Sequence, residues 1–278
     1  MHARTYQTLS YKLAAAASHI GNPSAWFYYA DRLSRRMTRR KIRFFSRNEA
    51  DAIYGAHARD LDAALQAVGL PGDVHDPRVL HAAQFERGKR QIERLDIPFG
   101  EMGLAGSSDL RLVYSAAIAT GARDILETGV ALGWSSLAFL NAVEHTRGRL
   151  ISVDLPYPFL IGRSWVGAAV PEDLHRRWTL LRHADRIGIP KALRLSDGFD
   201  LIHDDSDKSP EGRLWAYPRL WRALRPGGLL LSDDVGDNGI WADFCKRIDE
   251  PLIVVRRQRA YAGIVRKPLD AALTRISA

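Results

Sequence analysis

The sequence predicts an α/β protein with a mostly parallel, doubly wound sheet behind a helical N-terminal region. From about residue 105 onward, short apolar runs of β character alternate with segments of helical apolar spacing. One such run, 125–126, is followed by a glycine turn and then by a helix-spaced segment, which is the opening of a strand–turn–helix unit. The first 104 residues show helical spacing and no β alternation. We therefore expect a helical region at 1–104 and an α/β domain at 105–278.

Four helices are expected in the N-terminal region. They lie at 6–18, from Pro23 through an arginine-rich segment, at 49–68 and at 77–95. Asp76 is suited to the N-cap of the last helix and Pro77 to its first turn. A helical region in front of such a sheet commonly covers the binding site or forms the interface of a homodimer, and the sequence leaves both roles open.

The remaining elements follow in alternation. Expected strands are 125–126, 150–153, 179–181, 199–203, 229–232, 252–255 and 262–265. Expected helices are 109–119 with a serine cap at 107 or 108, 134–143, 172–178, 211–224 and 240–248. Between them, Pro156 and Pro158 interrupt regular pairing, so residues 155–165 are expected to form a loop long enough to reach over a bound ligand.

The composition is that of a soluble globular protein, with 46% apolar and 26% charged residues in 278. No apolar run approaches the roughly 20 residues needed to span a bilayer. The N-terminus lacks the apolar core of a signal peptide, so we expect a cytoplasmic protein without a membrane span. A single cysteine, Cys245, excludes an internal disulfide and a multi-cysteine zinc site.

The net charge of +8 raises the question of an anionic partner. The densest basic cluster comprises Arg32, Arg35, Arg36, Arg39, Arg40, Lys41 and Arg43. Its spacing covers several sides of a helix, which is typical of a solvated surface. Contact with a substrate phosphate, a lipid headgroup or RNA is the alternative. The sequence has no aromatic RNA-binding signature, which argues against nucleic acid.

The turn after 125–126 has the composition of a nucleoside-binding turn. It reads Glu127-x-Gly129-x-x-x-Gly133, and the next strand ends in Asp154, the position at which nucleotide-type folds bind a ribose diol. A dinucleotide fingerprint would need a third glycine. A carboxylate beside the turn suits a ligand with a cationic amino-acid end better than a pyrophosphate. The alternative is a tight turn of the kind found in any α/β protein.

This pair of motifs resembles motifs I and II of class I S-adenosylmethionine-dependent methyltransferases. The resemblance implies a Rossmann-like class I methyltransferase fold that binds S-adenosylmethionine. It also implies that the adenine side of the pocket lies at Ala184-Asp185. The residues expected to bind the cofactor are Glu127, Gly129, Gly133, Ser135, Asp154, Asp185 and Asp205.

Carboxylates follow several of the expected strands. Asp154, Asp205, Asp233 and Asp234 all stand at such positions, and the carboxyl ends of parallel strands meet at one edge of a sheet. Converging carboxylates repel one another, and a divalent cation offsets that repulsion. Oxygen ligands suit Mg²⁺, Mn²⁺ or Ca²⁺ better than zinc, so Mg²⁺ is an expected second cofactor.

The segment Asp205-Ser-Asp-Lys208, with Pro226-Gly-Gly and Asp233-Asp234 after it, resembles two families. One comprises the metal-dependent O-methyltransferases of the catechol and caffeoyl-CoA type, and the other the bacterial macrocin-type small-molecule methyltransferases. The first resemblance implies Asp205, Asp233 and Asp234 as metal ligands and Lys208 as the general base. The sequence departs from these patterns in having Asp234 in place of asparagine and Lys208 where the bacterial family often has histidine. The resemblance covers roughly 105–265.

Other interpretations of these residues stay open. Lys208 also suits a surface ion pair with Asp207 or Glu211, and Asp233-Asp234 suit simple strand-end capping. His203, inside an apolar run, is expected to be a satisfied core histidine. The aromatic residues of the next helix are expected to pack in the core; they are Trp215, Tyr217 and Trp221.

The sequence thus favours an S-adenosylmethionine-dependent O-methyltransferase that acts on a hydroxyl of a small molecule such as a sugar or a phenol. Methyl transfer needs alignment and an activated nucleophile, which a cation and a lysine base supply. One alternative is an RNA-binding protein or RNA methyltransferase that uses the Arg32–Arg43 cluster, although the base-flipping motif N-P-P-Y is missing. A second alternative is a non-catalytic protein of the same fold.

Overall fold

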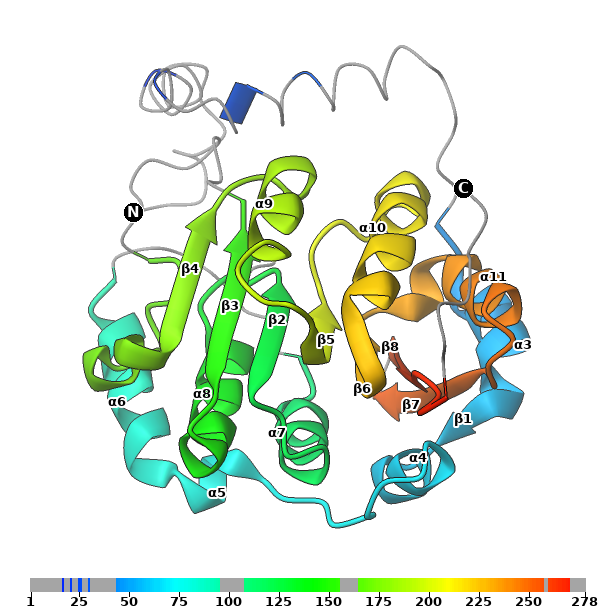
Figure 1. Cartoon of the computed structure of the whole chain (residues 1–278), viewed down its shortest axis with the longest axis horizontal. Coiled ribbons are helices and arrows are strands. Elements are labelled where there is room, and N and C mark those ends of the chain that lie inside the picture. Colours follow the sequence, from blue (N-terminus) through cyan, green and yellow to red (C-terminus); the bar gives the residue numbers. More distant parts are fainter. Residues whose placement is uncertain are drawn as a thin grey trace.

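One mixed sheet of eight strands forms the centre of the molecule (Figure 1). The computed structural model describes residues 44–95, 108–155, 165–257 and 260–270, together with 17, 21, 25, 26 and 30. The strand order is β1-β7-β8-β6-β5-β2-β3-β4. The strands are β1 (Ala58–Arg59), β2 (Asp124–Thr128), β3 (Arg149–Asp154), β4 (Trp178–Arg182), β5 (Phe199–Asp204), β6 (Leu224–Ser232), β7 (Ile253–Arg257) and β8 (Ala260–Arg266).

The sheet is parallel except at β8, which pairs antiparallel with both β6 and β7. All other neighbouring strands run parallel. This confirms the mostly parallel sheet expected from the sequence, in which β5 and β6 are neighbours. The chain order reverses direction across the sheet between β2 and β5, and ligands of open α/β sheets bind at such a switch point.

Helices cover both faces of the sheet, because alternate side chains of each strand point to opposite faces. Ile125 of β2 packs in one core with α4, α7 and α8, and Leu126 packs in the other with α3, α9, α10 and α11. The helices are α3 (Arg47–Tyr54), α4 (Leu61–Ala67), α5 (Pro77–Leu80), α6 (Ala82–Glu93), α7 (Leu110–Ala119), α8 (Trp134–Thr146), α9 (Asp185–Ala192), α10 (Pro210–Ala223) and α11 (Ile240–Arg247), with 3₁₀ turns at Gly55–His57, Glu172–Arg177 and Val235–Asp237. The doubly wound architecture is therefore confirmed.

The expectation of one helix at 49–68 was wrong. The chain forms α3, turns at Gly55–His57, adds the two-residue strand β1 to the sheet edge beside β7, and then forms α4. Asp60 starts the second helix, because its side chain accepts a hydrogen bond from the amide of Ala63 at 2.8 Å. Residues expected to be purely helical thus also extend the sheet. The domain division at 104 stays a prediction.

The N-caps of α5 and α7 were also predicted from the sequence. Asp76 caps α5 and Pro77 is its first residue, as expected, although α5 ends at Leu80 and α6 follows it. For α7 the serine cap was wrong, because the Asp109 carboxylate accepts from the amides of Arg111 and Leu112. A carboxylate at a helix N-terminus also interacts favourably with the helix dipole, which a serine hydroxyl does less well.

Several sequence-based predictions concern residues outside the described ones. They are the helix at 6–18, the helix beginning near Pro23, the Arg32–Arg43 cluster, and most of the proline-containing loop at 155–165. Across the part of the chain that is described, no helix combines the length and apolar character that crossing a bilayer requires.

Candidate active site

The candidate site lies at the carboxyl ends of the central strands. There, backbone hydrogen bonds also join the residues that directly follow neighbouring strands. The Gly129 amide donates to the carbonyl of Val153 at 2.8 Å, and the Asp205 amide to that of Thr128 at 2.9 Å. The Asp233 amide donates to the carbonyl of Asp204 at 3.0 Å. These three bonds fix the turns after β2, β5 and β6 relative to one another. The expected convergence of sequence-distant residues at one edge is therefore realised.

The turn after β2 depends on left-handed backbone. Gly129 has φ +82° and Gly133 has φ +89°, a region that L side chains rarely adopt. A Cβ at Gly129 would lie 2.3 Å from the carbonyl oxygen of Asp205, and one at Gly133 would lie 2.8 Å from Cα of Gly167. Both glycines thus allow backbone segments to approach closely. The turn leads directly into α8, whose N-cap is Gly133.

Glu127 lies beneath this turn with no solvent-exposed surface. Its carboxylate accepts hydrogen bonds from the hydroxyls of Ser135 at 2.6 Å, Ser136 at 2.5 Å and Ser152 at 2.8 Å. Burial raises the pKa of Glu127, and the three hydroxyl donors oppose that shift. These contacts connect β2, β3 and the start of α8. Direct contact of Glu127 and Ser135 with a cofactor stays a prediction.

Asp154 and Asp185 lie at the ends of neighbouring elements on the same edge. Asp154, 2% exposed at the end of β3, accepts from the amide of Ala131 at 3.0 Å, so it is joined to the glycine turn. Asp185 begins α9 and accepts from the hydroxyl of Ser206 at 2.8 Å. Burial raises the pKa of Asp185 to about 7. The two carboxylates are thus connected to the turns after β2 and β5 respectively.

Lys208 lies between two carboxylates. Its Nζ is 3.0 Å from Oδ1 of Asp205 and also forms a close ion pair with Asp234. Lys208 therefore pairs with Asp205 and Asp234, and not with Asp207 or Glu211, which was the alternative that the sequence left open. The other oxygen of Asp205 accepts from the hydroxyl of Ser108 at 2.9 Å.

The charge of each residue in this cluster shifts the pKa of its neighbours. Burial alone would lower the pKa of Lys208, but the carboxylates of Asp205 and Asp234 outweigh it and raise that pKa above its ordinary value. Burial and the charge of Asp233 raise the pKa of Asp205. Asp233 pairs with Arg257 at 2.6 Å, which overcomes burial and lowers the pKa of Asp233. Lys208 is therefore an ammonium ion in this arrangement.

His203 is the first functional candidate that the sequence interpretation missed. We expected a satisfied core histidine, but Nδ1 of this 2%-exposed side chain has no hydrogen-bond partner among the described residues. A ring nitrogen of His203 and carboxylate oxygens of Asp205 and Asp233 lie within 4.8 Å of one another. The available signal was the strand period of two, which puts His203 and Asp205 on the same side of the chain.

Arg213 is the second missed residue. It is 1% exposed on α10 and donates to the backbone carbonyls of Asp233 at 2.8 Å and Asp234 at 2.9 Å. It also donates to Oδ1 of Asn238 at 3.4 Å, while Nδ2 of Asn238 donates to the carbonyl of Lys208 at 2.9 Å. This Arg213–Asn238 clamp holds the turns after β5 and β6 together. It also satisfies the carbonyls of a turn in which Asp234 has φ +48°.

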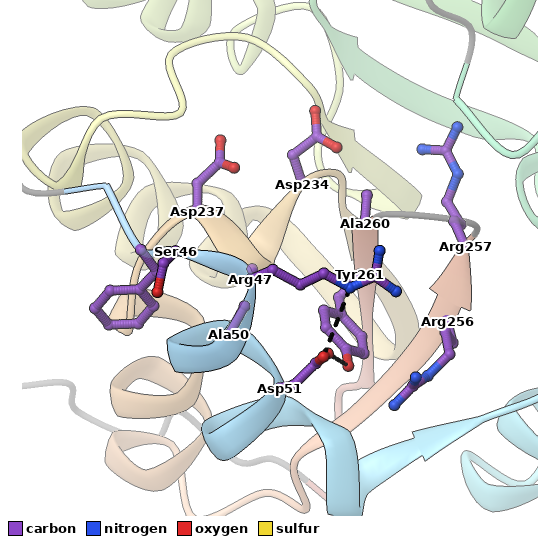
Figure 2. Close-up of a pocket in the computed structure, with 12 residues that line it drawn as sticks. Ser46, Arg47, Ala50, Asp51, Asp234, Asp237, Arg256, Arg257, Ala260 and Tyr261 are labelled. Atoms are coloured by element: carbon purple, nitrogen blue, oxygen red, sulfur yellow. Dashed lines mark hydrogen bonds and ion pairs between the residues drawn. The ribbon is translucent and has the colours of Figure 1, made fainter.

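A small pocket opens beside the cluster (Figure 2). Its volume is about 150 Å³, and Asp234 and Asp237 lie on one side of it, away from Asp51 and Tyr261 on α3 and β8. Its charged and hydrogen-bonding lining includes Arg47, Asp51, Asp234, Asp237, Arg256 and Arg257. A pocket of this lining suits a polar group better than an apolar one.

The comparisons with known proteins agree with this fold. Residues 126–235, which span the glycine turn, Lys208 and Asp233-Asp234, match the family model described as a methyltransferase domain. This segment is therefore similar to known methyltransferase domains, and the match agrees with the methyltransferase activity that the sequence motifs indicated. A search of curated proteins found no match.

Solved methyltransferase structures are similar over most of the chain. The O-methyltransferase TomG from Streptomyces achromogenes, solved with S-adenosylmethionine, is 20% identical, with 69% of this chain and 89% of that chain covered and a TM-score of 0.46. The Podospora anserina methyltransferase PaMTH1 is 16% identical, with coverages of 80% and 97% and a TM-score of 0.48. The Bacillus cereus O-methyltransferase is 17% identical, with coverages of 78% and 98% and a TM-score of 0.43.

Proposed function

We propose that this methyltransferase transfers a methyl group from S-adenosylmethionine to a hydroxyl of a polar small molecule, with a divalent cation and Lys208 activating that hydroxyl. The observation that carries the proposal is the position of the Lys208 ammonium between Asp205 and Asp234, directly beside the glycine turn. The small, charged pocket next to Asp234 supports a polar acceptor such as a sugar or a phenol.

The residues at the sheet edge fit the cofactor. The left-handed backbone at Gly129 and Gly133 leaves no Cβ between the turn and a ligand. Asp154 is suited to the ribose hydroxyls and Asp185 to the adenine side. Glu127 keeps the turn in place through the serine hydroxyls that it binds. When bound, S-adenosylmethionine supplies the electrophilic methyl group, and the protein mainly aligns the acceptor oxygen with it.

Among the described residues, the carboxylates of Asp205 and Asp233 lie close to His203 in a group that fits a divalent cation. Asp205, Asp233 and Asp234 would hold it, and its charge would acidify the acceptor hydroxyl. Lys208 can accept a proton only as the neutral amine. Its two carboxylate partners favour the ammonium, so added positive charge among those carboxylates would shift its pKa downward toward that of a working base.

The cofactor part is tested by calorimetry with S-adenosylmethionine. We expect the wild type to bind, and Asp154→Ala to weaken binding by about tenfold or more, since a hydrogen bond to a charged group contributes about 1.5–3 kcal/mol. Asp243→Ala, an exposed carboxylate on α11, is the matched control and should bind like the wild type. Undiminished binding by Asp154→Ala would reject the assigned site.

The acceptor part is tested by measuring S-adenosylhomocysteine release with a panel of catechols and sugars, with and without a chelator. For an accepted substrate, Lys208→Ala should lower kcat by about 10²–10⁴-fold while cofactor binding stays unchanged. Lys246→Ala, on the exposed side of α11, is the control. Activity that survives both the chelator and Lys208→Ala would leave a methyltransferase without the proposed cation and base.

A further inference from the structure

We propose that His203 is a ligand of the divalent cation, and that the site therefore selects a transition-metal ion such as Mn²⁺ or Fe²⁺ over Mg²⁺. This inference rests on the metal-assisted function proposed above. The ligands of the cation would then be an imidazole nitrogen of His203 and carboxylate oxygens of Asp205 and Asp233, in place of carboxylate oxygens alone.

The imidazole of His203 is buried and lacks a hydrogen-bond partner among the described residues. His203 is buried in β5 between the paired strands β2 and β6, with Phe139 of α8 against it at 5.7 Å between ring centroids. Within the part of the chain that the structure describes, Nδ1 has no hydrogen-bond partner. Leaving a buried polar atom unsatisfied costs about 1–3 kcal/mol, and most buried polar side-chain atoms in proteins are paired. A bound cation would give the ring the partner that it lacks.

Carboxylate oxygens of two aspartates lie close to the imidazole. The ligand atoms of His203, Asp205 and Asp233 fall within 4.8 Å of one another, a separation that one ion can bridge. His203 and Asp205 are two residues apart on one strand end, and the Asp233 amide bond to the Asp204 carbonyl holds the third ligand beside them. The three groups are therefore brought together by the sheet itself rather than by flexible loops.

Both carboxylates are held in place by other side chains. Arg257 binds Asp233 at 2.6 Å, and Ser108 donates to Asp205 at 2.9 Å. Such outer partners orient metal-binding carboxylates and hold them in place. Lys208 and Arg257 also offset the two negative charges, so the cluster is stable before an ion enters. Three protein ligands leave coordination positions open for the acceptor oxygen.

The ligand chemistry decides which ion is favoured. Carboxylate and water ligands suit Mg²⁺ and Ca²⁺, whereas imidazole suits first-row transition metals. Mn²⁺ accepts both kinds of ligand and is also detectable by magnetic resonance. A site with one imidazole and two carboxylates should thus prefer Mn²⁺ or Fe²⁺ to Mg²⁺, even where Mg²⁺ supports some turnover.

The test is metal binding by the full chain in the absence of any acceptor. Calorimetry should show one Mn²⁺ per chain, bound about tenfold or more tightly than Mg²⁺. Pulsed electron paramagnetic resonance of bound Mn²⁺ should show coupling to a ¹⁴N nucleus of imidazole. His203→Gln, which offers an oxygen in place of the nitrogen, should remove the coupling and reduce the preference for Mn²⁺ by about tenfold. His57→Gln, exposed in the described chain, should change neither.

Each outcome separates the two proposals. Mn²⁺ bound without ¹⁴N coupling, or coupling that survives His203→Gln, overturns His203 as a ligand and leaves a metal-assisted reaction intact. Failure of the wild type to bind any of the ions overturns both the ligand and the cation, while calorimetry with S-adenosylmethionine still tests the methyltransferase itself. If His203→Gln does not fold, wild-type protein labelled with ¹⁵N-histidine decides, because the ¹⁴N coupling should be replaced by ¹⁵N coupling, and a surviving ¹⁴N coupling would overturn a histidine ligand.

Discussion

At the scale of single residues, the site is a set of buried and half-buried charged groups whose surroundings determine their protonation. Lys208 is kept charged by Asp205 and Asp234, and Asp233 is kept charged by Arg257. Asp185 is the opposite case, because burial favours its neutral form and raises its pKa to about 7. This carboxyl group therefore changes charge near neutral pH, where most aspartates are already ionised.

Asp185 makes stability depend on pH. Its pKa is higher in the folded protein than its ordinary value of 3.8, so the folded state holds the proton more tightly. Its stabilising contribution is complete below about pH 3.8 and is lost as pH rises toward and through 7. We expect Asp185→Asn to gain stability relative to the wild type between pH 5 and pH 8, measured by denaturant unfolding. Parallel pH profiles would contradict this assignment.

At the scale of elements, the close approach of two turns explains why glycine stands after β2. Alanine at Gly129 would meet the backbone of Asp205, whereas alanine at Gly121, with φ +60°, would meet nothing within 4 Å. Both positions carry the same left-handed backbone. The difference in stability between the two alanine variants therefore reports the contact between the turns after β2 and β5, separately from the cost of the backbone conformation.

The two alanine variants should differ in a defined way. Gly121→Ala should cost about 1 kcal/mol in the free energy of unfolding, from backbone conformation alone. Gly129→Ala should cost about 2–4 kcal/mol and also weaken S-adenosylmethionine binding, because Asp205 must move. Chemical denaturation and calorimetry on both proteins provide the measurement. Equal losses in the two variants would show that the turns are not in the tight contact described.

At the scale of the whole molecule, the described helices α3 and α4 and strand β1 are part of the fold's core. Tyr54 of α3 donates to the carbonyl of Asn238 at 2.7 Å, β1 pairs with β7, and Leu65 of α4 is completely buried in the core that contains α7 and α8. A lid that moved as a separate unit would lack such connections. Residues 47–67 therefore stabilise the same sheet that carries the site.

This organisation predicts one cooperative unfolding transition. Leu65→Ala should destabilise the whole protein by about 2–5 kcal/mol, as deletion of a buried leucine side chain usually does. Leu80→Ala, at a position 56% exposed on α5, should stay within about 0.5 kcal/mol of the wild type. Calorimetry and tryptophan fluorescence should report the same shifted midpoint. A separate early transition in Leu65→Ala would indicate an independent N-terminal unit.

The sequence was informative wherever periodicity and turn chemistry decide the structure. The strand ends at Asp154, Asp205 and Asp233 could be located because apolar runs stop there. The two residues of β1 are too few to show a period, and the helix expected across them was accordingly wrong. The sequence could not show that Arg213 is buried, because an arginine on a helix usually faces solvent. It also could not show that His203 lacks a partner among the described residues, because buried polar side chains are usually hydrogen-bonded. Both features depend on tertiary contacts.

The pocket beside Asp234 is built from two kinds of parts. The groups proposed for chemistry stand on the cross-connected ends of β5 and β6, while Arg47 of α3 and Arg256 of β7 line the pocket from other elements. The hydrogen bonds that join the turns after β2, β5 and β6 do not involve these two arginines. In the proposed enzyme, acceptor choice could therefore be redesigned at Arg47 and Arg256 without rebuilding the residues proposed for methyl transfer.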